Sequence, residues 1–257
     1  MKKTIEPGET IMKIRYEISG LIRSLIIGLL LVSAPTLALA QDAEPGYVNF
    51  RIHTVLRGQA AAWESIMRER RDAEDAAGRP FRRVFQRIRG PESTYLILHL
   101  DAAVGQTELP AVDISPTWGE RLNSTLDSSV LLTLQTYPEL TANLDRWLTQ
   151  DTDLMQVRIR TTAPGRAQDY HDWQANELFP ALTDAGVTIR GFRVYLGGST
   201  RTWVRLSVVE DWASLTEVSP IIESREFEGI IADEAEMLAA TEDLLYQYRA
   251  DLSYVNE

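Results

Sequence analysis

The sequence of 257 residues contains no cysteine, so it offers no disulfide, no thiolate nucleophile and no cysteine metal ligand. All three lysines lie before residue 41, which leaves the rest of the chain without a lysine for Schiff-base or general-base chemistry. The three histidines do not form a His-x-x-x-His metal motif. A phosphate loop, a dinucleotide fingerprint and a nucleophile elbow are also missing. We therefore expect no metal site and no common nucleotide cofactor.

The first forty residues have the pattern of a secretory signal peptide. Lys13 and Arg23 precede an apolar run over 25–32, and a segment of small residues ends in Ala38-Leu39-Ala40. The run is too short to span a bilayer, whereas the Ala-x-Ala ending is typical of a cleavage site. We expect a mature protein in the periplasm or outside the cell, with no membrane association after cleavage. An uncleaved membrane anchor is the alternative.

The residues after position 40 are strongly acidic. They comprise 217 residues with 21 arginines and 34 acidic residues, for a formal charge of −13. Such a chain is repelled by nucleic acid and by anionic membrane surfaces, so we expect neither as a partner. The acidic runs at 72–75, 233–236 and 242–243 are interpreted as solvated surfaces on or beside helices.

An internal repeat indicates how the chain is organised. Arg51-Ile52-His53-Thr54-x3-Gly58-x-Ala60 recurs as Arg158-Ile159-Arg160-Thr161-x3-Gly165-x-Ala167, and Trp63 falls opposite Tyr170. Further matches continue in the same order, which predicts a duplication. The expected boundaries are a signal peptide over 1–40, a first repeat over 41–141, a helical linker over 142–152 and a second repeat over 153–257.

Hydrophobic periodicity alternates between strand and helix within each repeat. Tyr47–Leu56 alternates as a strand does, and Gln59–Ala77 has apolar residues at helical spacing before Gly78. The first repeat is expected to have strands at 47–56, 81–89, 94–100 and 129–137, and helices at 59–77 and from 115. The second is expected to have strands at 154–162, 187–197, 201–209 and 244–249, and helices at 165–184 and 219–240. Both follow the β-α-β-β-α-β order of the ferredoxin-like unit.

Two such units in one chain resemble the dimeric α/β-barrel superfamily, in which two ferredoxin-like sheets face each other and enclose a cavity. The superfamily includes antibiotic-biosynthesis monooxygenases, NIPSNAP-type proteins and chlorite dismutase-like haem enzymes. The resemblance implies an α+β fold with two tandem ferredoxin-like βαββαβ repeats that form an intrachain α/β-barrel. A second copy of the chain is a candidate partner, as a homodimer.

The expected strands contain twelve arginines and no Asp or Glu. One strand face is aliphatic, and we expect it to pack on the helices. The other carries arginine, histidine and aromatic residues, and the resemblance implies that it lines the barrel cavity. Arginine binds anions bidentately and aromatic rings stack on rings, so this face predicts a site for a small anionic, aromatic ligand. The candidate ligand-binding residues are Arg51, Arg83, Arg87, Tyr95, Arg158, Arg160, Arg193, Tyr195, Trp203 and Arg205.

Other interpretations of this face remain open. His53 and His99 fall on it in adjacent strands, so one of them is a candidate general base for a phenol or quinol, with Arg51 stabilising the anion. That arrangement resembles cofactor-independent monooxygenases, in which the substrate anion activates oxygen. A third hypothesis is a structural or interaction module. Alternatively, the arginines pair with carboxylates of helices and loops.

His171 lies near the start of the first helix of the second repeat. Haem ligation is considered because fused tandem barrels include haem enzymes, but the signature stretches of those enzymes are not seen. We therefore expect no cofactor, and a His171 that packs beside Trp173 on the flank of its helix.

Overall fold

The computed structural model describes residues 46–88, 93–99, 109–143, 154–209, 211–213 and 225–256. The chain divides into units 1–44 and 45–257, and all described residues belong to the second unit. The expected signal peptide, most of the expected linker and the Ser219-Pro220 helix start lie outside the described residues. In the part of the chain that the structure describes, no helix combines the length and apolarity needed to cross a membrane.

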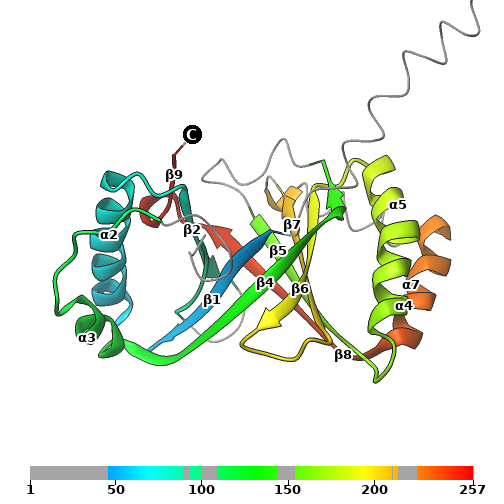
Figure 1. Ribbon diagram of the computed structural model, residues 1–257, viewed down its shortest axis with the longest axis horizontal. Helices are drawn as coiled ribbons and strands as arrows, with labels where there is room; N and C mark the ends of the chain where they lie inside the picture. Colours follow the sequence, from blue (N-terminus) through cyan, green and yellow to red (C-terminus); the bar gives the residue numbers. More distant parts are fainter. Residues whose placement is uncertain are drawn as a thin grey trace, which may run out of the picture. The chain divides into compact units, whose positions relative to one another are not determined.

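Eight strands of the described chain close into an antiparallel barrel (Figure 1). Around the barrel they follow the order β1, β4, β6, β7, β5, β8, β2 and β3, and β3 pairs again with β1. Their bounds are β1 Tyr47–Val55, β2 Phe81–Arg87, β3 Thr94–His99, β4 Leu126–Ala142, β5 Leu154–Thr162, β6 Ile189–Leu196, β7 Thr202–Val209 and β8 Leu238–Tyr248. The expected α+β barrel is therefore confirmed.

Helices cover the outer face of the barrel. The first half of the barrel, which comprises β1 to β4, carries α2 (Ala60–Ala76) and α3 (Trp118–Asn123). The second half, which comprises β5 to β8, carries α4 (Ala167–Trp173), the π-helix η2 (Gln174–Leu178), α5 (Phe179–Asp184) and α7 (Arg225–Met237). After β8 the chain forms the short 3-10 helix η3 (Ala250–Leu252) and the strand β9 (Tyr254–Val255), which pairs with β2 in the first half.

The ends of α2 and α5 follow the glycine signals in the sequence. Gly78 has a φ of +69° and Gly186 a φ of +73°, a left-handed conformation that glycine adopts without steric cost. The amide of Gly78 donates to Asp75, and that of Gly186 donates to Thr183, so each glycine caps the last turn of its helix.

The barrel interior is filled by the aliphatic strand faces. One apolar core draws on every barrel strand, with Phe50, Phe85, Leu98, Leu134, Val157, Phe192, Leu206 and Tyr246 among its buried members. Because successive side chains on a strand point to opposite faces, Arg51 and His53 point away from this core, toward the helices. The expectation that the aliphatic face packs on the helices is therefore wrong, and of the candidate arginines only Arg83 and Arg87, which share the face of Phe85, point into the barrel. Closing the barrel excludes water from its centre, whereas the helices bring carboxylates to the outer face.

Strands β4 and β8 are longer than the sequence predicts. β8 begins at Leu238, where a helix was expected to continue to Ala240, because its first residues pair with β5 along the whole length of that strand. Tertiary pairing here overrides the helix preference of an alanine-rich segment. The longer strands also include acidic residues, so the absence of Asp and Glu holds only for the expected bounds; the acidic members are Asp127, Glu139, Glu242 and Asp243.

Candidate functional site

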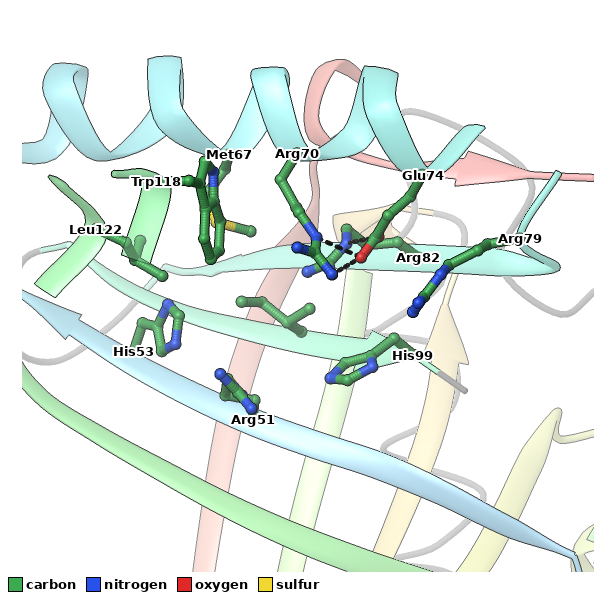
Figure 2. Close-up of a pocket in the computed structure, with 11 residues that line it drawn as sticks. Arg51, His53, Met67, Arg70, Glu74, Arg79, Arg82, His99, Trp118 and Leu122 are labelled. Atoms are coloured by element: carbon green, nitrogen blue, oxygen red, sulfur yellow. Dashed lines mark hydrogen bonds and ion pairs between the residues drawn. The ribbon is translucent and has the colours of Figure 1, made fainter. Parts of the chain in front are cut away.

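A cavity of about 230 Å³ lies in the first half, between α2, α3 and the outer face of β1, β2 and β3 (Figure 2). Its lining consists of Arg51, His53, Met67, Arg70, Glu74, Arg79, Arg82, Ile97, His99, Trp118 and Leu122. The volume lies below the roughly 300–1,000 Å³ of typical drug-sized ligand sites, so it suits a compact ligand.

Three cross-strand rows form the floor of this cavity. From β1 through β3 to β2 they are His53–Tyr95–Gln86, Arg51–Ile97–Val84 and Asn49–His99–Arg82. Neighbouring rows are two residues apart, so the His53 row and the His99 row lie about 13 Å apart along the strands. The expectation that His53 and His99 lie on one face of adjacent strands is confirmed, although that face is under α2.

The His53 end of the cavity is largely apolar. Leu122 lies near His53 at this end, and Figure 2 draws Met67 and Trp118 together above the floor, between Leu122 and Arg70. The Trp118 indole nitrogen donates to the carbonyl of Ile66, so its polar atom already has a partner within the protein. Behind His53, the rings of Trp63 and Tyr95 stack with centroids 3.9 Å apart.

His53 is held as a neutral ring. The Trp63 indole Nε1 donates to Nδ1 of His53 at 3.2 Å. An indole nitrogen can only donate, so Nδ1 is the acceptor and Nε2 carries the proton. Burial, followed by the nearby charges of Arg51 and Arg82, lowers the pKa of His53 to about 3. Nε2 is buried and has no hydrogen-bond partner in the described structure.

The opposite end of the cavity is cationic. Glu74, which is 2% exposed, accepts hydrogen bonds from Nε of Arg82 at 2.6 Å and from Nη2 of the same residue at 2.8 Å, and it also pairs with Arg70. Burial raises the pKa of Glu74, but Arg82 and Arg70 outweigh that effect and hold the pKa at about 2. The lining thus contains four arginines and one permanently ionised carboxylate, a net positive charge.

The end of the chain completes this site from the second half. The Tyr254 hydroxyl donates to Glu74 at 3.3 Å. Arg249 donates to Glu64 at 2.7 Å and to Gln86 at 2.8 Å, and Glu64 also accepts from the Tyr95 hydroxyl at 2.9 Å. The segment 249–256 therefore ties α2 to the sheet on which the cavity rests.

The candidate residues chosen from the sequence do not form one site. Arg51 lines the cavity and Tyr95 belongs to its floor, whereas Arg83 and Arg87 alternate with Arg82 and share the inward face of Phe85. Tyr195 is 42% exposed and packs on Tyr47. Arg193 donates to the carbonyl of Thr200 at 2.7 Å and lies over the ring of Trp203.

In the second half, arginines of the outer face pair with a helix carboxylate. Arg205 and Arg160 both contact Glu234 of α7, which also accepts from the Tyr170 hydroxyl at 2.9 Å. Arg160 reaches Asp243 at 2.7 Å as well. The alternative that the arginines pair with carboxylates is confirmed for these two. Burial and the neighbouring Arg205 lower the pKa of Arg158 to about 10.

Sequence reasoning missed Arg70, Glu74, Arg79, Arg82 and Trp118. The first three lie on α2 or just beyond it, and the acidic run at 72–75 was interpreted as a solvated surface. That interpretation is wrong for Glu74, which α2 turns toward the sheet, and likewise for Glu234 in the run at 233–236, which α7 turns toward Arg160 and Arg205. The helical spacing of Met67, Arg70 and Glu74 is the one signal in the sequence that places them on a single face.

The surroundings of His171 do not fit a haem. Its Nε2 lies 3.1 Å from Glu139 and its Nδ1 lies 3.4 Å from Asp172, so both ring nitrogens face carboxylates. The rings of Tyr137 and Trp203 pack against the imidazole, whereas Trp173, the expected neighbour, stacks on Tyr170. Among the residues that the structure describes, no group of three or more His, Asp or Glu side chains is placed to hold a metal ion.

The fold of this chain is similar to that of several solved structures. The "putative monooxygenase" of Fusobacterium nucleatum aligns with a TM-score of 0.60 at 10% identity, over 81% of this chain and 94% of that protein. The "putative monooxygenase" of Lactobacillus acidophilus gives 0.58 at 10% identity, over 83% and 97%. An anthrone oxidase-like protein gives 0.57 at 10% identity, over 84% and 94%. At this identity the likeness shows the fold alone, and it confirms the resemblance to the dimeric α/β-barrel fold. No family model and no curated protein matches the sequence.

Proposed function

We propose that this protein binds a small anionic molecule with an apolar, ring-sized body in the cavity beneath α2. The observation that carries the proposal is the division of the cavity lining. Arg79, Arg82 and His99 lie at one end, Leu122 lies at the other, and Trp118 lies above the floor between them (Figure 2). A carboxylate or phenolate fits the cationic end because guanidinium groups bind such anions with charge-assisted hydrogen bonds.

Charge balance supports an anionic ligand. Glu74 neutralises part of the charge of Arg70 and Arg82, and it stays ionised at all ordinary pH values because its pKa is about 2. Arg79, at the same end, adds a further positive charge to the lining. An anion entering this end compensates a positive site inside an otherwise acidic protein.

Calorimetry with benzoate, phenylacetate and 4-hydroxybenzoate tests the proposal. We expect binding to the wild type and an affinity at least 10-fold lower in Arg51→Gln and Arg79→Gln, because one charge-assisted hydrogen bond contributes about 1.5–3 kcal/mol. Arg121→Gln is the matched control, since Arg121 pairs with Glu69 on the exposed surface. Benzamide should not bind. Equal binding of benzamide and benzoate, or no binding by any of the acids, contradicts the proposal.

A second candidate function is a cofactor-independent monooxygenase acting on a quinol. The observation that favours it is the presence of His99 and Arg51 in one cavity of a barrel whose fold is shared with monooxygenase-named proteins. His99 would accept the quinol proton and Arg51 would stabilise the anion. His53 is unsuited as the base, because Trp63 occupies its Nδ1 and its pKa lies near 3.

The oxygenase chemistry balances without an added reductant. A hydroquinone and O2 give a hydroxyquinone and water: one oxygen atom enters the ring, the other leaves as water, and the quinol supplies all four electrons. We expect oxygen consumption with hydroquinones that is lost in His99→Gln and retained in the control His171→Gln, which changes a histidine outside this cavity. Consumption that is equal in both variants, or no greater than without protein, contradicts this function.

We also propose that the two halves of the barrel are tandem ferredoxin-like repeats. Both halves have the element order β-α-β-β-α-β, and the rows of β1–β3 match those of β5–β7 residue by residue, which supports the duplication.

We further propose that the protein is exported, as the signal-like segment before Gln41 suggests. Mass spectrometry of the protein from a periplasmic extract tests export: a mature N-terminus at Gln41 is expected.

A further inference from the structure

We infer that His53 is a hydrogen-bond donor to the bound ligand, and that the ligand therefore carries an uncharged acceptor, such as a carbonyl oxygen, at the end opposite its anionic group. This inference rests on the proposed function, since it assigns the second recognition point in the same cavity. It makes His53 a specificity-determining residue and gives it a role other than that of a base.

The surroundings of His53 fix its Nε2–H as a hydrogen-bond donor. His53 is 1% exposed, and Trp63 fixes its tautomer from the side of α2. The remaining N–H of the ring has no acceptor among the described residues. A buried N–H without a partner is unfavourable by about 1–3 kcal/mol, so such groups are rare unless a ligand or a water completes them.

The position of this donor specifies the ligand geometry. His53 lines the cavity beside Leu122, at the far end from His99 and Arg82 (Figure 2). The side chains that lie between these ends are those of Arg51 and Ile97 on the floor, with Met67 above them. A ligand that satisfies both ends is an elongated ring compound with a carboxylate at one end and a neutral acceptor at the other.

A neutral group suits the His53 end better than a second anion, because Arg79 and Arg82 lie at the opposite end of the cavity. The ring at this end is neutral, Leu122 is apolar, and Trp118 already donates to Ile66 and has the Arg70 guanidinium over its ring. A second carboxylate placed there would be desolvated with one neutral N–H as its new partner at that end. A carbonyl, in contrast, is satisfied by a single donor.

Two isosteric probes isolate this hydrogen bond. 4-Acetylbenzoate and 4-isopropylbenzoate have the same number of non-hydrogen atoms, the same branching and the same charge, but only the first carries a carbonyl acceptor. We expect the wild type to bind 4-acetylbenzoate about 10-fold more tightly by calorimetry. The preference should disappear in His53→Phe and be partly restored in His53→Gln, which replaces the donor with an amide N–H. Cooperative thermal unfolding of each variant confirms that it is folded.

The outcomes separate the inference from the proposed function. If neither probe binds, the proposed function fails. If both bind equally and His53→Phe changes nothing, anion binding stands and the role of His53 is overturned, with a buried water as the partner of Nε2. A second measurement needs no variant: in ¹⁵N-resolved NMR of the wild type, the Nε2 proton of His53 should shift downfield with saturating 4-acetylbenzoate and not with 4-isopropylbenzoate. An unchanged signal with both bound probes also overturns the inference.

Discussion

The two halves of the barrel carry matched rows of residues under their helices, but the helix carboxylates pair with arginines at different positions in the two halves. The row His53–Tyr95 corresponds to Arg160–Trp203, and the row Arg51–Ile97 corresponds to Arg158–Arg205. In the first half the helix carboxylate Glu74 pairs with Arg82 at one end of the floor. In the second half Glu234 pairs with Arg160 and Arg205 at its centre. The helix carboxylate therefore lies beside a cavity in the first half, whereas in the second half it joins two arginines in one ion cluster.

Packing follows the same division. Trp63 stacks on Tyr95 and donates to His53, whereas Tyr170 meets Trp203 edge-on and donates to Glu234. Both arrangements satisfy buried cations, because an unpaired guanidinium in a dry interior is strongly unfavourable. The comparison teaches that strand arginines alone do not indicate a binding site; the helix residues above them decide.

The largest expected effect comes from breaking the ion cluster of the second half. Glu234→Gln leaves Arg205 and Arg160 without this shared carboxylate, and we expect the free energy of unfolding to fall by about 3–5 kcal/mol. Urea unfolding measures it. Glu236→Gln, on the exposed face of the same helix, should change stability by less than about 0.5 kcal/mol. Equal effects would mean that the cluster does not hold the second half together.

The matching test in the first half uses pH. The pKa of Glu74 is about 2 in the folded protein and 4.5 without these contacts, so its contribution to stability is complete above about pH 5 and is lost as the pH falls toward 2. The shift corresponds to about 3 kcal/mol. We expect the stability of the wild type to fall more steeply than that of Glu74→Gln between pH 5 and pH 2, by thermal unfolding. Parallel profiles would show that Glu74 is not paired as described.

A smaller effect is expected from exchanging one residue between the halves. Gln174, fully buried in η2, has no partner for either amide atom in the described structure, and it falls opposite Met67 when Trp63 is aligned with Tyr170. We expect Gln174→Met to raise the free energy of unfolding by about 1–3 kcal/mol, because it removes an unsatisfied polar group. Met67→Gln should lower it. A loss of stability in Gln174→Met would mean that water or a ligand satisfies this amide.

The fold could be predicted well from the sequence because its signals are local. Alternation over Tyr47–Leu56 and the glycine at Gly78 mark a strand and a helix end that depend on few distant contacts. The extension of β8 to Leu238 could not be predicted in this way, since it depends on pairing with β5, more than seventy residues earlier in the chain.

The candidate site was predicted only in part. The sequence itself determined that one strand face carries Arg51, His53 and His99, because strand periodicity fixes which residues share a face. Only the tertiary structure decided that this face lies under the helices and not inside the barrel. Periodicity separates two faces without saying which is inner. Barrel closure, which buries eight aliphatic faces against one another, and the carboxylate of Glu74, which α2 brings to Arg82, made that choice.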